Sequence, residues 1–167
     1  EAADASGLVF SYRRHGPDSG QSAAIQEGWD KLAEADILCW LNADDLLFAD
    51  GVAEALEAFA ADPDLDVHYS ESTIIDSEGS TVGVHPQVLD DPALLLKACT
   101  ISQPSCFVRR SAVEAVGGVD PDLEYTMDWD LWARLYLAGR RFRKGRGFAS
   151  AVFWGAGTKT SQFNAAR

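Results

Sequence analysis

Cysteine and histidine are scarce in this sequence, and none of them forms a metal or disulfide motif. The chain has three cysteines and three histidines, and no CxxC or Cys/His spacing typical of a zinc site occurs among them. Cys39, Cys99 and Cys106 all lie in apolar surroundings, so we interpret them as small core residues. This usage excludes a disulfide-rich secreted scaffold and predicts a protein of a reducing compartment, the cytoplasm.

Positive charge and long apolar runs are also scarce. Lysine and arginine total 14 against 26 aspartates and glutamates, and the net charge is −12. Because binding a phosphate backbone needs a basic face, this composition argues against nucleic acid as a partner. No stretch approaches the ~20 consecutive apolar residues of a membrane span, so we expect no transmembrane segment.

One basic run, residues 140–146, stands out in this acidic chain. We interpret it as a solvated end of the last predicted helix, where the helix dipole favours cations. The alternative is contact with anionic lipid-linked acceptors or membrane headgroups. That contact would place the protein peripherally at the inner face of a membrane.

What is present indicates one folded domain. The 167 residues are 47% hydrophobic and 24% charged, which is typical of a globular domain with a real core. We therefore expect a single domain over residues 1–167. The chain opens with Glu1 rather than Met, so we expect it to be a piece of a longer protein.

Predicted strands and helices alternate along the chain. Apolar patterning and turn residues predict strands at 7–12, 36–41, 67–70, 72–75, 81–84 and 105–109, and helices at 20–34, 50–61, 91–98, 111–117 and 127–138. Asp50 and Ser111 are the predicted N-caps of two of these helices. The alternation predicts an α/β layered fold, and the hairpin of 72–75 with 81–84 predicts a mixed sheet.

An apolar run, Ile37 to Leu41, ends abruptly in Asn42, Asp44 and Asp45. Open α/β sheets bind ligands just beyond the carboxyl ends of their strands. Two adjacent carboxylates at such a place suit a hard divalent cation, and Mg²⁺ is usually held by one or two carboxylates plus substrate phosphates. The alternative is a solvated turn, because Asn and Asp are common turn formers.

A second acidic cluster begins the last predicted helix. Asp128 lies between Met127 and Trp129, which would shield its carboxylate from water and raise its pKa toward that of a useful base. The alternative is a helix cap without chemistry. Asp130 and Arg134 have the i,i+4 spacing of a surface ion pair. Trp129 would stack on a sugar ring or belong to the core.

Four segments, in order, resemble the inverting, metal-dependent glycosyltransferases of the GT-A fold, family 2. The resemblance spans about residues 18–160. The first segment is similar to a glycine-led stretch ahead of the family's metal motif, the second to its DxD-type motif, the third to its acceptor-side strand and loop, and the fourth to its acidic helix start. These segments are Gly20–Gly28, Trp40–Asp45, Gln103–Arg110 with Gly117–Asp120, and Met127–Arg134.

The resemblance implies a GT-A-like mixed sheet sandwiched by helices, and a sugar transfer from a nucleotide-sugar donor to a glycan or lipid-linked acceptor. Asp44 would coordinate Mg²⁺ or Mn²⁺, and Asp45 would assist the metal or contact the sugar. Asp128 would deprotonate the acceptor hydroxyl. The implied substrate-binding residues are Gln21, Asn42, Asp45, Gln103, Trp129 and Lys159.

The chain departs from the family in three places. The family has two βα units ahead of the glycine-led segment, which bind the nucleoside base, and we expect the given sequence to begin after them. Asn42 stands where many members have the first Asp of the motif, so one charge is missing. Phe153 and Gly155 occupy the places of an Arg and a His ahead of Thr158-Lys159-Thr160. A non-catalytic carbohydrate-binding or scaffolding domain therefore stays open as the alternative function.

Overall fold

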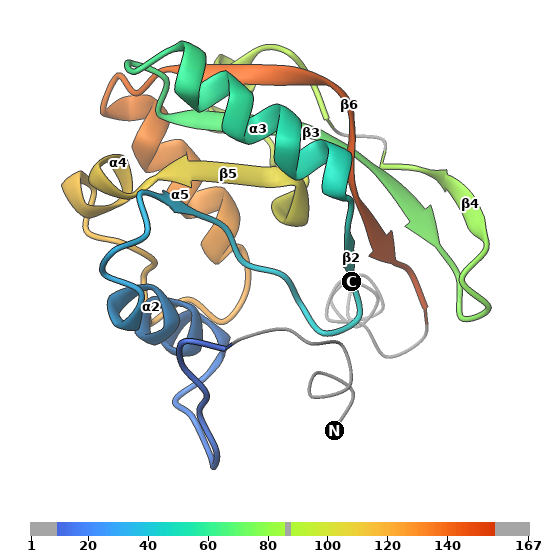
Figure 1. The fold of residues 1–167 in the computed structure, drawn as a ribbon, viewed down its shortest axis with the longest axis horizontal. Coiled ribbons are helices and arrows are strands. Elements are labelled where there is room, and N and C mark those ends of the chain that lie inside the picture. Colours follow the sequence, from blue (N-terminus) through green and yellow to red (C-terminus); the bar gives the residue numbers. More distant parts are fainter. Residues whose placement is uncertain (1–9, 86–87, 156–167) are drawn as a thin grey trace.

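The computed structural model describes residues 10–85 and 88–155. This part of the chain forms a mixed α/β fold around one curled sheet (Figure 1), which confirms the predicted α/β class. The elements, in chain order, are α2 (Gln21–Lys31), β1 (Ile37–Leu38), β2 (Leu46–Leu47), α3 (Ala49–Ala61), β3 (Val67–Ile75), β4 (Thr81–Val84), the 3-10 helices η1 (Pro92–Leu96) and η2 (Gln103–Ser105), β5 (Cys106–Arg109), α4 (Arg110–Ala115), α5 (Met127–Leu137) and β6 (Phe142–Phe153).

The sheet is mixed, as predicted. Its strands lie in the order β1-β5-β3-β6-β2, and β4 pairs with β3. Strands β3 and β6 are parallel, while the other neighbours are antiparallel. Strand β1 lies at an edge and pairs with β5, its sole partner strand among the described residues. The loop that follows β1 therefore starts at the rim of the sheet.

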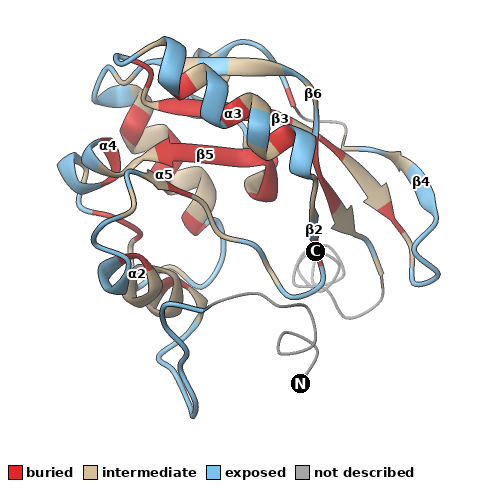
Figure 2. Ribbon diagram, in the orientation of Figure 1, coloured by how far each residue is buried: buried red, intermediate tan, exposed pale blue. Residues whose placement is uncertain are grey.

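Helices cover both faces of the sheet. On β5, Val108 packs into the core that contains Trp132 of α5, whereas the next residue back, Phe107, packs against Phe59 of α3. This alternation follows from the two-residue period of a strand, which points neighbouring side chains to opposite faces. Figure 2 shows the resulting burial, with β3 and β5 buried between the helices.

The longest strand, β6, was not predicted. Its first half is the basic run, which we interpreted as the solvated end of a helix, and that interpretation is wrong. The basic side chains instead meet acids of neighbouring segments: Lys144 pairs with Glu71 of β3 at 2.8 Å, and Arg141 pairs with Asp62 at 3.0 Å. These pairs offset the like charges of the run and let it enter the sheet.

Helix α3 approaches β6 closely through a glycine. Gly51 is buried, and a Cβ on it would lie 2.3 Å from the Cα of Ala149. The buried face of the helix therefore runs through Gly51, Ala55 and Phe59. We expected Asp50 as the N-cap, but Phe48 takes that position without a side-chain cap, and Asp50 lies in the first turn.

Several other local predictions need correction. Residues 10–12 form an exposed loop rather than a strand, and residues 7–9 lie outside the described part. The helix predicted at 91–98 is the short η1, which Asp91 caps by accepting a hydrogen bond from the Ala93 N–H. Arg109, not Ser111, is the N-cap of α4. In the described part of the chain, no helix is long and apolar enough to cross a membrane.

Candidate active site

The acidic loop joins two strands of the sheet. It leaves the edge strand β1 and enters β2, which pairs with β6 at the opposite edge of the sheet. The backbone N–H of Asp45 donates to the carbonyl oxygen of Asn42 at 3.2 Å, so residues 42–45 do form a turn. This turn is not merely solvated, because its side chains line a pocket.

Asn42 is the centre of a hydrogen-bond network at the pocket wall. Its Nδ2 donates to Oε1 of Gln103 and to Oδ2 of Asp45, both at 3.1 Å. Its Oδ1 accepts from Nε2 of Gln21 at 2.8 Å. Gln103 is fixed in turn, because its Nε2 donates to the carbonyl oxygen of Trp40 at 2.6 Å. The network ties α2, the acidic loop and η2 together.

The two adjacent aspartates occupy different environments. Asp45 is 8% exposed, and its Oδ1 accepts a hydrogen bond from the Phe153 N–H at 3.0 Å. Burial raises the pKa of Asp45 above its ordinary value, against the two hydrogen bonds that lower it. Asp44 is exposed and lines the pocket. Asp45 thus holds the loop to β6, and Asp44 is the carboxylate that a ligand reaches first.

Asp128 begins the wall on the other side. It lies in the first turn of α5, whose N-cap Thr126 has a left-handed backbone with φ 60°. Its Oδ1 accepts from the Trp129 N–H at 2.8 Å, so Asp128 pairs an N–H of the first turn, although Thr126 and not Asp128 is the N-cap. Burial raises the pKa of Asp128, although this backbone hydrogen bond lowers it. Asp128 can pair this N–H and still be a base of raised pKa in this geometry.

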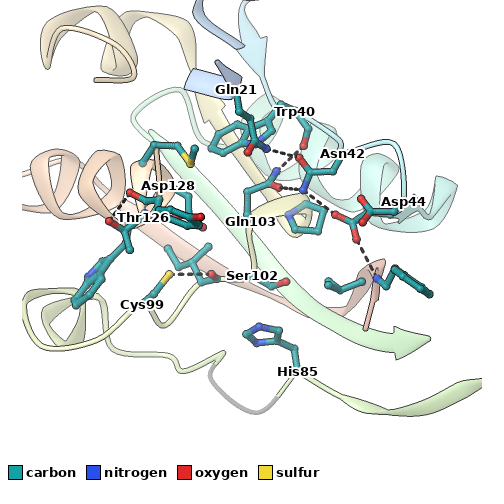
Figure 3. A pocket seen from close by; sticks show the side chains of 18 of the residues that line it. Gln21, Trp40, Asn42, Asp44, His85, Cys99, Ser102, Gln103, Thr126 and Asp128 are labelled. Atoms are coloured by element: carbon teal, nitrogen blue, oxygen red, sulfur yellow. Dashed lines mark hydrogen bonds between the residues drawn. The ribbon is translucent and has the colours of Figure 1, made fainter. Parts of the chain in front are cut away.

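The separate predictions meet in one cavity of about 670 Å³. Figure 3 shows Asp128 and Asp44 on opposite sides of it, with Asn42 and Gln103 between them in this view. Sequence predictions that line the cavity are Gln21, Asn42, Asp44, Asp45, Gln103, Asp128 and Trp129. Lys159, the remaining predicted binding residue, lies outside the described residues.

The tryptophans near the cavity have different roles. Trp132 is fully buried and stacks on Trp40, with ring centroids 5.6 Å apart, so it belongs to the core. Trp129 is half-buried, lines the cavity, and donates from Nε1 to the Leu95 carbonyl oxygen at 2.6 Å. The ring of Trp129 is thereby held at the cavity wall. The ion pair predicted between Asp130 and Arg134 is present at 2.7 Å.

Sequence reasoning missed other residues of this wall. His85 directly follows β4 and lines the cavity, although no sequence motif includes it. Burial lowers its pKa, and its Nδ1 is buried without a hydrogen-bond partner. Cys99 and Ser102 also line the cavity. No spacing in the sequence connects these residues to the acidic motifs, because the β3–β4 hairpin brings His85 there and the segment between η1 and η2 brings Cys99 and Ser102.

The charge of the cavity bears on the predicted metal. Its described lining contains four carboxylates, those of Asp44, Asp45, Glu124 and Asp128, and neither lysine nor arginine. The described residues hold no cluster of three or more His, Cys, Asp or Glu side chains placed as metal ligands. Asp44 with Asp45 nonetheless fits an open Mg²⁺ or Mn²⁺ site, since such cations take one or two carboxylates and complete their shell with phosphate oxygens and water.

Comparison with known proteins adds no assignment to this geometry. A scan against protein-family models finds no match, and a search of curated proteins finds no significant match.

Proposed function

We propose that this chain is the metal-motif and acceptor part of a GT-A-type glycosyltransferase. It would transfer a sugar, with inversion, from a nucleotide-sugar donor to a glycan or lipid-linked acceptor. One observation carries the proposal: a single cavity collects the acidic loop, Gln103 and Asp128 from distant parts of the chain. The motif order that resembles family 2 supports the same reaction.

Asp128 is the proposed base. Its carboxylate lines the cavity, and its pKa is raised by burial, so it is better matched to accepting a proton near neutral pH than an exposed aspartate is. As the acceptor hydroxyl forms its bond to the anomeric carbon, the hydroxyl proton passes to Asp128. The bond between the anomeric carbon and the diphosphate oxygen breaks on the opposite face, which inverts the configuration.

Asp44 is the proposed cation ligand, and Asp45 fixes its position. The cavity lining is acidic, so a diphosphate would be repelled without a counter-charge. Bound Mg²⁺ or Mn²⁺ supplies that counter-charge and offsets the charge that develops on the leaving diphosphate. The side chains of Gln103 and Trp129 then offer an amide and an aromatic face to the sugar, groups suited to hydroxyls and to a ring face.

A non-catalytic carbohydrate-binding domain is the second candidate. The amides of Gln21 and Gln103, which line the cavity together with Trp129, favour it, because amides and an aromatic ring suit sugar binding without any chemistry. The two candidates differ at Asp128. A binding domain keeps its ligand when Asp128 is replaced by Asn and turns over no donor in either form.

The test is a donor screen. The full-length protein is incubated with a panel of nucleotide sugars, with Mn²⁺ and with chelator, and release of the nucleoside diphosphate is followed with and without glycan acceptors. We expect release that needs the cation and that fails in Asp128→Asn. Trp129 and Trp40 line the cavity, so their fluorescence reports donor binding independently of turnover. Donor binding without turnover in the wild type would favour the binding domain.

A further inference from the structure

Asn42 occupies a position where only an amide satisfies its surroundings. Its two neighbours on the Nδ2 side, Oδ2 of Asp45 and Oε1 of Gln103, are both acceptors. On its Oδ1 side, Gln21 Nε2 is a donor. A residue at this position must therefore supply two donors and one acceptor, which matches the hydrogen-bonding inventory of asparagine.

The two acceptors that face Asn42 are each held by another hydrogen bond, which reorientation would break. Gln103 is oriented by the bond from its Nε2 to the Trp40 carbonyl oxygen at 2.6 Å. Asp45 is oriented by the bond that its other oxygen accepts from the Phe153 N–H at 3.0 Å. A carboxylate at position 42 would face two acceptors in a part-buried place, and leaving polar groups there unpaired costs more than a surface bond is worth.

We propose that Asn42 is a positioning residue of the site rather than a ligand contact. Its amide holds the acidic loop against α2 and η2, and it binds the Asp45 carboxylate, so that Asp44 is the exposed carboxylate of the loop. This network then requires an asparagine at position 42, where many members of the family have the first Asp of the motif. This role replaces the substrate-binding role that the family resemblance implies for Asn42.

The proposal has a consequence for the cation, which rests on the proposed function. Because both Asp45 oxygens already accept hydrogen bonds from the protein, Asp44 is the carboxylate of the acidic loop that stays open to a cation. Cation binding should then depend on phosphate oxygens far more than on the protein. Mn²⁺ alone should bind weakly, and a nucleoside diphosphate should tighten it.

A side-chain swap tests the positioning role. Asn42→Asp leaves two acceptors without donors, so its Tm should fall by roughly 3–8 °C. In the double variant Asn42→Asp/Asp45→Asn, the new amide at 45 donates to the new carboxylate at 42 and still accepts from the Phe153 N–H. The swap conserves net charge relative to the wild type. At least half of the lost Tm should therefore return.

Binding separates positioning from ligand contact. Affinity for Mn²⁺ with uridine, guanosine or adenosine diphosphate should fall about tenfold in Asn42→Asp and recover in the swap together with the Tm. Ser111→Asp, an exposed position on α4, controls for the added negative charge and should leave both readouts unchanged.

Recovery of the Tm without recovery of binding would show that residue 42 or 45 touches the ligand, which would overturn the positioning role. Absence of Tm recovery would overturn the network itself. If the wild type binds none of these diphosphates, the proposed function fails, while the Tm comparison still decides whether Asn42 organises the loop.

Discussion

Phe153 donates its backbone N–H to Oδ1 of Asp45 at 3.0 Å, and this bond ties the acidic loop to the last residue of β6. The two residues are 108 positions apart in the chain. Asp45 therefore belongs to the framework of the cavity, whereas its neighbour Asp44 is exposed to it. Two adjacent aspartates of one motif thus have separable tasks.

The first prediction separates those tasks with two alanine variants. Asp45→Ala leaves the part-buried Phe153 N–H and one Asn42 N–H without an acceptor, so the free energy of unfolding should fall by roughly 1–3 kcal/mol. Asp44→Ala changes an exposed side chain and should cost less than about 0.5 kcal/mol. Urea unfolding measures both. Titration of Mn²⁺ with a nucleoside diphosphate should show the larger loss in Asp44→Ala, and unchanged affinity in that variant would remove Asp44 from the metal site.

The second prediction concerns Asp128. Its raised pKa means that the ionised form is disfavoured in the folded state. Between the ordinary pKa of an aspartate and this raised pKa, the folded chain binds more protons than the unfolded chain, so stability falls as the pH rises through this window. Above the raised pKa the full cost of the buried charge remains. Asp128→Asn should therefore raise the Tm at neutral pH while it lowers kcat by roughly 10²–10⁴. Donor affinity should change little, because Asn has nearly the same volume and still accepts from the Trp129 N–H.

Asp130→Asn is the matched control for Asp128. It sits two residues further along α5 and loses a partly exposed ion pair with Arg134, which is worth at most about 1 kcal/mol. Its Tm should fall slightly, and its turnover should survive. Near-normal kcat in Asp128→Asn would rule out the proposed base.

The sequence was informative where periodicity and local chemistry decide the structure. The apolar stripe of 127–138 predicted α5, and the two strand segments predicted at 67–70 and 72–75 form the single strand β3. Not every apolar residue of this stripe is buried, since Leu137 is 70% exposed. For the cavity, Asp44 in the turn after β1 and Asp128 in the first turn of α5 were both chosen from the sequence, and both line it.

The parts that sequence reasoning missed depend on distant partners. Strand β6 begins with a basic run, and the local sequence alone indicates that this run is solvated. Its place in the sheet depends on a distant partner, because Lys144 pairs with Glu71 of β3. Likewise, nothing near Asp45 in the sequence indicates that the Phe153 N–H will take one of its oxygens. The hairpin strand at 81–84 was predicted, but no pattern indicated that His85, directly after it, would line the cavity. Tertiary pairing, not local propensity, decided these positions.

The third prediction is a pH dependence. Burial lowers the pKa of His68 and His85 below the ordinary value of 6.5, and for His68 the nearby Glu54 opposes this while Arg143 adds to it. Just below pH 6.5 the unfolded chain therefore binds protons that the folded chain does not. Stability should fall as the pH decreases from about 7 to about 6. The raised pKa values of Asp45 and Asp128 act in the opposite direction at lower pH, so the comparison belongs in this window.

Urea midpoints at the two pH values measure this effect, and His68→Gln should flatten the slope. His68 is 1% exposed and its Nδ1 has no hydrogen-bond partner, so it should carry a large share of the dependence. His15→Gln, at an exposed position, is the matched control and should leave the slope as it is. An equal slope in wild type and His68→Gln would show that burial of His68 does not govern this pH range.

The last prediction compares the same substitution in two helices. In Gly51→Ala the new Cβ of α3 would lie 2.3 Å from Cα and 2.5 Å from Cβ of Ala149, so helix and strand must separate. Overpacking of this kind costs roughly 1–3 kcal/mol. In Gly28→Ala, on α2, no atom lies within 4 Å of the new Cβ. That variant should gain about 0.5–1 kcal/mol, because alanine is the better helix former. Urea unfolding of the two variants should therefore give shifts of opposite sign.

Gly51→Ala should also reach the cavity, since Ala149 lies on the strand whose end holds Asp45 through the Phe153 N–H. A displaced β6 weakens that bond, and affinity for Mn²⁺ with a nucleoside diphosphate should fall along with the stability. Gly28→Ala should keep its affinity, because the new methyl group points into open space. A Gly51→Ala variant as stable as the wild type would show that α3 and β6 are not packed as closely as 2.3 Å implies. A destabilised Gly51→Ala variant that keeps full affinity would instead show that the acidic loop does not depend on the position of β6.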